Sequence, residues 1–278
     1  MDILFKNKVR GLQFTGGEPF LYPQIFEAFL YASSKGFLTS VATNGSLIDE
    51  KKAALIRKCH VNNLEISIDH FNKKIIEENR GIKDIQEKIE NAIKFLKIQN
   101  MNVQGLTTIS RLNYLDLEKI LEYQSQIGIK GTTFCYPMVS MDSTFKLGGD
   151  SKYVTFSKEE LIEILIEIKK LHKKYNILNP VESIDDIIRF LEGKKVKFEC
   201  LGGSKIFYLD WNLDLHKCMK KNEKISIFDS DNFFGNKTSC NECIHECFRD
   251  PSIFYHGFKS IIPLIRFAKK GQKVYNFI

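Results

Sequence analysis

The sequence lacks the segments that send a protein into a membrane or out of the cell. No apolar run reaches the roughly 18 residues that cross a bilayer, and no signal peptide opens the chain. Internal repeats and low-complexity segments are absent, and the net charge of +7 is spread out without a long basic block. We therefore expect a cytoplasmic protein with no transmembrane segment. We also expect no nucleic-acid partner, because no aromatic and basic stripe accompanies the charge.

The first half of the chain alternates between short apolar runs and longer amphipathic runs. The strand-like runs are Val9–Phe14, Leu38–Ala42, Asn63–Ile68, Val103–Ile109 and Gly131–Tyr136, and the helix-like runs are Gln24–Lys35, Asp49–Lys58, Asp84–Gln99 and Leu115–Gln126. This alternation predicts an α/β fold of parallel strands joined by right-handed crossovers. Periodicity alone does not distinguish between an open doubly wound sheet and a complete or partial barrel.

Polar side chains inside a predicted strand favour the barrel. A period of two puts Glu65, Ser67 and Asp69 on one face of their strand. A doubly wound sheet needs apolar groups on both faces, whereas a barrel interior can hold a polar ligand. Ligands of parallel α/β folds bind where the strands end. Those ends are Thr15–Glu18, Thr43–Gly45, Ser67–Asp69, Ser110–Arg111 and Tyr136–Met138.

The first predicted strand ends in the turn Thr15-Gly16-Gly17-Glu18-Pro19. Glycine permits backbone conformations and close approaches that a Cβ atom forbids, and proline fixes the exit of the chain. Such a turn presents backbone polar groups and one carboxylate, which suit the ammonium and carboxylate groups of a ligand. An ordinary strand-to-helix turn is the alternative.

Five of the seven cysteines gather in one part of the chain, at Cys200, Cys218, Cys240, Cys243 and Cys247. In a cytoplasmic protein, clustered cysteines indicate metal ligation rather than disulfides. A predicted hairpin of Ile206–Leu209 and Leu213–Lys217 brings the first two together. The other three follow as a Cys-x2-Cys-x3-Cys knuckle.

The expected ligands are Cys200, Cys218, Cys240 and Cys243, with Cys247 as a spare. A Cys-x2-Cys pair commonly presents both thiols to one metal centre, which is the reason for this choice. The spacing is compatible with either zinc or an iron–sulfur cluster as the bound group. His216 or His245 could replace a thiol at zinc.

Several strings occur in order along the chain: Thr15–Pro19, Ala42–Gly45, Ser67–Asp69, Asn79–Gly81 and Tyr208–Asn212. With the cysteines, they resemble the radical S-adenosylmethionine (radical SAM) superfamily, in the branch that carries a SPASM- or twitch-type auxiliary iron–sulfur domain. The resemblance implies a partial (β/α) barrel over residues 1–196, without its first strand. A small cysteine-rich hairpin domain over 197–250 and a basic, aromatic tail over 251–278 would follow.

The resemblance also implies a chemistry. S-adenosylmethionine would bind a 4Fe–4S cluster and be cleaved by one electron to a 5′-deoxyadenosyl radical that abstracts hydrogen from a substrate. The cofactor-binding residues implied are Gly16, Gly17 and Glu18 at the methionine end, then Asn44, Ser67, Asp69 and, more weakly, Arg80. The cysteines would hold an auxiliary 4Fe–4S cluster. The partners implied are a reductant such as flavodoxin or ferredoxin and a peptide or small hydroxylated substrate.

Two features depart from the family pattern. The radical-forming cluster of the family is held by Cys-x3-Cys-x2-Cys upstream of the Gly-Gly-Glu-Pro turn, and no cysteine precedes Gly16 here. We therefore expect an N-terminally truncated enzyme that is inactive alone. The alternative is a catalytically inactive metal-binding scaffold. In addition, Leu213 stands where the family hairpin usually has glycine.

The segment Ile253–Phe267 is rich in phenylalanine, tyrosine and isoleucine. We expect it to pack on the barrel or on the cysteine-rich domain. Lysine and arginine residues flank it, so a membrane or partner surface is the alternative.

Overall fold

The structure is a computed structural model that describes residues 1–137, 152–234 and 239–269. It divides into two compact units, and each is described by itself. Unit 1 contains Met1–Phe134 and Lys174–Leu178, and unit 2 contains Cys135–Lys173 and the described chain from Asn179 onward. The two helices that follow residue 151 group with unit 2, and the predicted boundary at residue 196 stays a prediction. The predicted strand end at Met138 lies outside the described residues.

Unit 1 is built on a parallel sheet whose five strands lie in sequence order. They are β1 (Gly11–Phe14), β2 (Leu38–Thr43), β3 (Asn63–Ser67), β4 (Val103–Thr108) and β5 (Thr132–Cys135). In the parallel register, Phe14 pairs with Val41 and Ser67 pairs with Leu106. The predicted α/β fold of parallel strands is confirmed.

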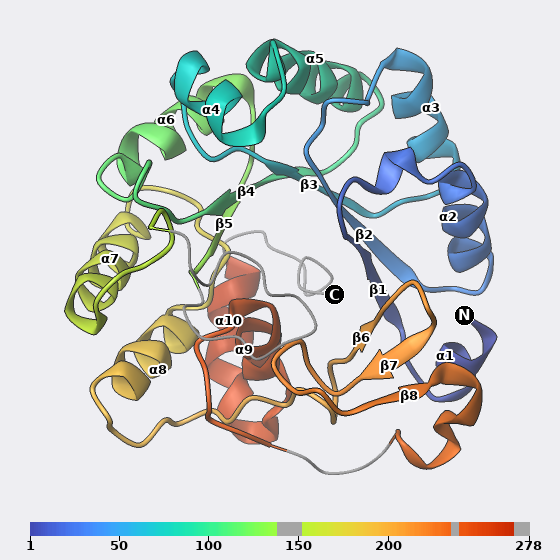
Figure 1. Ribbon diagram of the computed structural model, residues 1–278, viewed down its shortest axis with the longest axis vertical. Coiled ribbons are helices and arrows are strands. Elements are labelled where there is room, and N and C mark those ends of the chain that lie inside the picture. The colour runs from blue at the N-terminus through green and yellow to red at the C-terminus, as the bar shows by residue number, and fades with distance from the viewer. Residues whose placement is uncertain (138–151, 235–238, 270–278) are drawn as a thin grey trace. The chain divides into compact units, whose positions relative to one another are not determined.

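The connections of the sheet distinguish a barrel from a doubly wound sheet. The helices of unit 1 are α1 (Asp2–Lys6), α2 (Ile25–Ser34), α3 (Glu50–Lys58), α4 (Lys73–Arg80), α5 (Ile85–Ile98) and α6 (Leu117–Ile127), with a 3-10 turn at Pro19–Leu21. Right-handed crossovers between strands in sequence order place every connecting helix on the same face. Figure 1 shows α2 to α6 along the outer side of the curved sheet. Unit 1 therefore has the winding of a partial (β/α) barrel.

The two faces of the sheet have opposite character. Val41, Leu64 and Ile66 are fully buried on the helix side, where they join a core of apolar residues from α2, α3 and α5. Glu65 and Gln104, which alternate with them along the strands, are buried on the other side. Strand alternation thus produces an apolar outer face and a polar inner face.

Helix α4 was absent from the sequence-based expectations. Asn72 caps it by accepting hydrogen bonds from the amides of Lys74 and Ile75 at 3.0 and 3.3 Å, and Gly81 ends it in the left-handed conformation with φ 63°. Ile76 is its one buried residue. A helix with so narrow an apolar face leaves little periodicity to detect.

Unit 2 combines helices with a small antiparallel sheet. Its elements are α7 (Lys158–Leu171), α8 (Val181–Leu191), β6 (Tyr208–Leu209), β7 (Asp214–His216), β8 (Lys224–Ser226), α9 (Glu246–Ser252) and α10 (Ile261–Lys269), with 3-10 turns at Ile227–Asn232, Ile253–Tyr255 and Gly257–Ser260. The predicted hairpin is confirmed as β6 and β7, which pair antiparallel. Strand β8 extends it, and this addition was not predicted because the strand has only three residues. Among the described residues, no helix is both long and apolar enough to cross a membrane.

Candidate functional site

The glycine turn after β1 leaves its backbone open to a ligand. Thr15, Gly16 and Gly17 are exposed. Gly16 has φ 133°, a conformation that residues with a side chain rarely adopt, and a Cβ built on Gly17 would meet no atom of the described residues within 4 Å. The space next to Gly17 is therefore free for another molecule.

Glu18 fixes this turn to the end of β2. Its Oε1 accepts hydrogen bonds from the hydroxyl of Thr43 at 2.7 Å and from the amide of Phe20 at 3.2 Å, and its Oε2 accepts from the amide of Asn44 at 2.8 Å. A carboxylate has about four acceptor positions, so these donors occupy most of them. The geometry gives Glu18 the task of positioning the turn. Asn44 in turn accepts a hydrogen bond from the Ser46 amide at 2.8 Å.

Asp69 makes the corresponding connection after β3. Its Oδ1 accepts from the amide of Thr108 at 3.0 Å, and its Oδ2 pairs with Arg80 at 2.5 Å and accepts from Asn79 at 2.9 Å. Burial raises the pKa of Asp69, and the Arg80 charge opposes that rise. The contact thus ties the end of α4 to the ends of β3 and β4. Ser67 lies just below, half-buried at the end of β3.

The inner face of the sheet carries a buried polar network below these strand ends. Glu65 accepts hydrogen bonds from Gln13 at 2.8 Å, from Ser40 at 3.0 Å and from Asn63 at 3.3 Å, and Asn63 also donates to Gln104 at 3.1 Å. Burial raises the pKa of Glu65 to about 7, and the three hydrogen bonds oppose that rise. Sequence parity placed Glu65 on this face but gave no reason to count it among the site residues.

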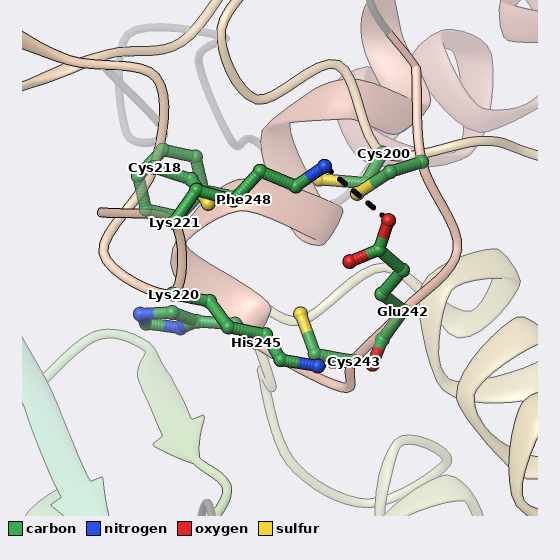
Figure 2. A pocket seen from close by; sticks show the side chains of 9 residues that line it. Cys200, Cys218, Lys220, Lys221, Glu242, Cys243, His245 and Phe248 are labelled. Carbon is green, nitrogen blue, oxygen red and sulfur yellow. Dashed lines mark hydrogen bonds and ion pairs between the residues drawn. The ribbon is translucent and has the colours of Figure 1, made fainter. Parts of the chain in front are cut away.

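Unit 2 holds the second candidate site, a pocket lined by four of the clustered cysteines. These are Cys200, Cys218, Cys240 and Cys243, and the other lining residues are Lys220, Lys221, Glu242, His245 and Phe248 (Figure 2). Cys247 is exposed and is not among the lining residues. The pocket therefore brings together the four cysteines chosen from the sequence as ligands.

Local structure explains how distant cysteines meet in the pocket. Cys200 and Cys240 form an isolated antiparallel bridge in which each amide donates to the carbonyl of the other, at 2.9 and 3.0 Å. The thiol of Cys200 also hydrogen-bonds the sulfur of Cys240, which lowers the pKa of Cys240 to about 6. Cys218 follows β7, and Cys243 lies one turn before α9. The four thiols are donors of the type found in all-cysteine zinc and iron–sulfur sites. Among the described residues, however, the group of three or more possible metal ligands whose donor atoms lie within 4.8 Å of one another is His245, Glu246 and Cys247, so the four sulfurs line one pocket without converging.

Charged groups lie at the edge of this pocket. Lys221 pairs with the carboxylate of Glu242 at 3.3 Å, as the dashed line in Figure 2 shows, and Lys220 donates to the Glu242 carbonyl at 2.7 Å. The Lys221 charge helps to lower the pKa of Cys240, whereas burial raises the pKa of Cys243 and the Lys220 charge opposes that rise. His245 lines the pocket, whereas His216 is buried against Asp210 at 3.1 Å within the hairpin.

The described residues of unit 1 do not offer the three thiolates of a radical-forming cluster. The first cysteine of the chain is Cys59, which is buried in the apolar core on the helix side of the sheet. The strand ends around Glu18 and Asp69 therefore provide polar groups for a ligand but no sulfur ligands for iron.

Comparison with known proteins relates the first part of the chain to a known superfamily. Residues 1–123 match the radical SAM superfamily. The AdoMet-dependent heme synthase of Oleidesulfovibrio alaskensis is 33% identical over 112 residues, which cover 39% of this chain and 29% of that protein. The subtilosin biosynthesis protein AlbA of Bacillus subtilis is 25% identical over 134 residues, which cover 48% and 30%. The chain thus spans about a third of the length of the curated relatives it matches.

Solved structures share the fold at low sequence identity. Native anSMEcpe with bound AdoMet and Cp18Cys peptide has a TM-score of 0.58 at 16% identity, covering 93% of this chain and 86% of that chain. Streptococcus suis SuiB bound to the precursor peptide SuiA has a TM-score of 0.60 at 12% identity, covering 80% and 53%. Residues 1–123, a little under half of the chain, thus match the radical SAM superfamily, and the chain shares the fold of these solved structures.

Proposed function

We propose that this chain supplies the S-adenosylmethionine-binding and auxiliary-cluster parts of a radical SAM enzyme. The observation that carries the proposal is the open Gly16–Gly17 turn, held by Glu18 against the end of β2. A ligand that approaches this turn meets bare backbone. Asn44, at the neighbouring strand end, is kept in place by the same carboxylate.

Each residue of the first site has a separate task in this proposal. The backbone at Gly16 and Gly17 binds the amino and carboxylate groups of the methionine part, while Asn44 and Ser67 bind the ribose and its neighbours. Asp69 and Arg80 hold α4 to the strand ends through their ion pair, in addition to the cofactor contact predicted for them. The hydrogen abstraction typical of the family needs a three-thiolate cluster, which the sequence before Gly16 does not contain. We therefore expect no reductive cleavage of S-adenosylmethionine by this chain alone.

The second site would hold a 4Fe–4S cluster on Cys200, Cys218, Cys240 and Cys243. Bound there, such a cluster supplies one-electron transfer. The four thiols anchor it, and Lys220 and Lys221 offset part of the negative charge of the thiolates. Structural zinc on the same thiols is the alternative, and it would make the chain a metal-binding scaffold rather than a redox protein.

The substrate belongs to the proposal as well. AlbA is named for bacteriocin biosynthesis, another relative is a PqqA peptide cyclase, and SuiB was solved with a precursor peptide. Heme synthases also appear among the relatives. A peptide substrate agrees with more of these relatives than a small hydroxylated molecule does, and a flavodoxin or ferredoxin would deliver the electrons.

Binding of S-adenosylmethionine to Gly17→Ala tests the first site. Within the part of the chain that the structure describes, the new methyl group meets no atom within 4 Å, so the fold and its melting temperature should stay unchanged. We expect calorimetry to show at least about tenfold weaker binding, because the methyl group occupies the space of the ligand. Unchanged binding in a folded Gly17→Ala protein would remove the glycine turn from the proposal. Anaerobic incubation with reductant then tests the second expectation, since formation of 5′-deoxyadenosine by this chain would contradict it.

Metal analysis separates the enzyme from the scaffold. Protein purified and reconstituted anaerobically should hold about four iron atoms per chain, with the charge-transfer absorption of a 4Fe–4S cluster. Stoichiometric zinc after the same procedure would support the scaffold instead.

A further inference from the structure

The C-terminal helical segment of unit 2 has one apolar stripe that is buried. Phe254, Pro263 and Phe267 are buried, and the rings of Phe254 and Phe267 lie 5.2 Å apart. The hydroxyl of Ser260 donates to the carbonyl of Ile253 at 2.7 Å, which fixes the turn ahead of α10. The segment belongs to unit 2, where His256 contacts Glu199 and Phe198.

A second apolar stripe on the same segment faces solvent. It consists of Phe258, Ile261, Ile262 and Ile265, which are 92%, 46%, 65% and 52% exposed. Their spacing of i, i+3, i+4 and i+7 is that of one face of a helix. Packing of α10 within unit 2 is already provided by the first stripe. The outer stripe is therefore apolar surface that the fold of unit 2 does not use.

Basic residues border the outer stripe. Lys259 and Lys269 are exposed, and Arg266 pairs with Glu182 at 2.6 Å. The sequence continues with Lys270 and Lys273, and no acidic residue occurs between Ser252 and the last residue. A molecule that binds this face must therefore bury its apolar side chains and be compatible with the positive charges around them.

Charge decides between the possible occupants. A second copy of the chain placed on this face by two-fold symmetry would bring two sets of lysines together, which is unfavourable. An anionic bilayer instead offers acyl chains to the isoleucines and phosphates to the lysines. A helix of this composition lies in the plane of the interface, and nine residues are too few to cross it.

We propose that α10 and the turn before it bind the surface of an anionic phospholipid bilayer through the outer stripe. Phe258 and Ile262, the two most exposed members, enter the boundary between headgroups and acyl chains. Lys259 and Lys269 contact the headgroup phosphates. The proposal rests on unit 2 alone and does not depend on the chemistry of either candidate site.

Co-sedimentation of the full chain with vesicles tests this proposal. Vesicles of phosphatidylglycerol and phosphatidylcholine should sediment the protein, and pure phosphatidylcholine vesicles should sediment several-fold less. Raising the salt concentration should reduce the bound fraction, because the phosphate contacts are screened. Ile262→Glu should lose most of the binding. Leu115→Glu in unit 1 is the matched control, since Leu115 is 80% exposed and lies outside the stripe.

Further outcomes support or contradict binding to an anionic bilayer. A double variant, Lys259→Glu with Lys269→Glu, keeps the apolar stripe and should still lose binding to anionic vesicles. Equal sedimentation of wild type, Ile262→Glu and Leu115→Glu would overturn the proposal. So would a wild-type protein that ignores both kinds of vesicle but forms a dimer that Ile262→Glu dissociates. Thermal unfolding of each variant confirms that the comparison is made on folded protein.

Discussion

Glu18 and Thr43 are joined by a 2.7 Å hydrogen bond that connects the glycine turn after β1 to the end of β2. The same carboxylate accepts from the amides of Phe20 and Asn44. Glu18→Gln would turn an NH2 group toward at least one of these amides, whichever way the new side chain is oriented. We expect a loss of about 1–3 kcal/mol in the free energy of unfolding, because a backbone donor loses its acceptor.

Urea unfolding measures this loss, and calorimetry with S-adenosylmethionine measures the effect on the turn. Glu78→Gln is the control, since Glu78 is an exposed residue of α4. The control should change the free energy of unfolding by less than about 0.5 kcal/mol. Equal stability of the two variants would mean that Glu18 does not hold the turn.

Replacement of a cysteine that lines the pocket should affect iron binding much more than replacement of Cys247. Cys200→Ala and Cys218→Ala each remove a sulfur that lines the pocket, so both should lose bound iron after anaerobic reconstitution. Cys247→Ala should retain it, because Cys247 is exposed and does not line the pocket. Iron and sulfide analysis gives the result directly. An empty site in Cys247→Ala combined with a full site in Cys240→Ala would reverse the ligand assignment.

The sheet of unit 1 was predictable because its signals are local. Each strand is a short apolar run closed by polar or glycine residues, and the parity of Glu65, Ser67 and Asp69 already indicated a polar inner face. The same parity could not show that Glu65 meets Gln13 and Ser40, since those contacts join three different strands. The register between strands depends on packing across the whole sheet, so it cannot be predicted from a single sequence.

The positioning roles of Glu18 and Asp69 were hidden for the same reason. Both residues were predicted to touch the cofactor, and the structure adds that their carboxylates are bonded to Asn44, Thr108 and Arg80. Whether they also contact the cofactor stays a prediction. For the pocket in unit 2, the sequence supplied the thiols and their spacing. The backbone bridge between Cys200 and Cys240 carries no sequence signature.

The free energy of unfolding should depend on pH through Glu65. Burial raises the pKa of Glu65 from 4.5 in the unfolded chain to about 7 in the folded protein. Between these values the folded protein keeps a proton that the unfolded chain releases, so stability falls as pH rises from 4.5 to 7. Above pH 7 this contribution stays constant. Asp250, whose pKa burial also raises to about 7, acts in the same direction.

Comparison of Glu65→Gln with wild type isolates the contribution of Glu65, because Asp250 is common to both. The variant and wild type should differ little near pH 4.5. The variant should be more stable by at most about 3 kcal/mol near pH 7, since one pH unit corresponds to about 1.4 kcal/mol. Urea unfolding across this range, with Glu78→Gln as the exposed control, provides the measurement. A difference that does not change with pH would show that Glu65 is ionised in the folded protein throughout.

Leu213 adopts φ 62° in the turn between β6 and β7, where the left-handed conformation favours glycine. Its amide donates to the carbonyl of Asp210 at 3.0 Å and its carbonyl accepts from Ile227 at 2.9 Å, so the turn holds the residue in this conformation. For a residue with a side chain, this conformation costs about 1–2 kcal/mol of backbone strain. Glycine avoids that strain, but ordering its more flexible backbone on folding costs about 0.5–1 kcal/mol. Leu213 is 43% exposed, so more than half of it is buried, and removal of its side chain offsets the relief of backbone strain. Leu213→Gly should therefore leave the free energy of unfolding of unit 2 nearly unchanged.

Leu115→Gly provides the matched comparison for this last prediction. Leu115 is 80% exposed and has no positive φ, so its replacement brings only the entropic loss of about 0.5–1 kcal/mol. The two leucine-to-glycine variants should thus differ by about 0.5 kcal/mol or more in urea unfolding, and Leu115→Gly should be the less stable of the two. Iron binding should be unchanged in both, since neither residue lines the cysteine pocket. If Leu213→Gly destabilises the protein as much as Leu115→Gly does, the turn of the hairpin does not impose the left-handed conformation in solution.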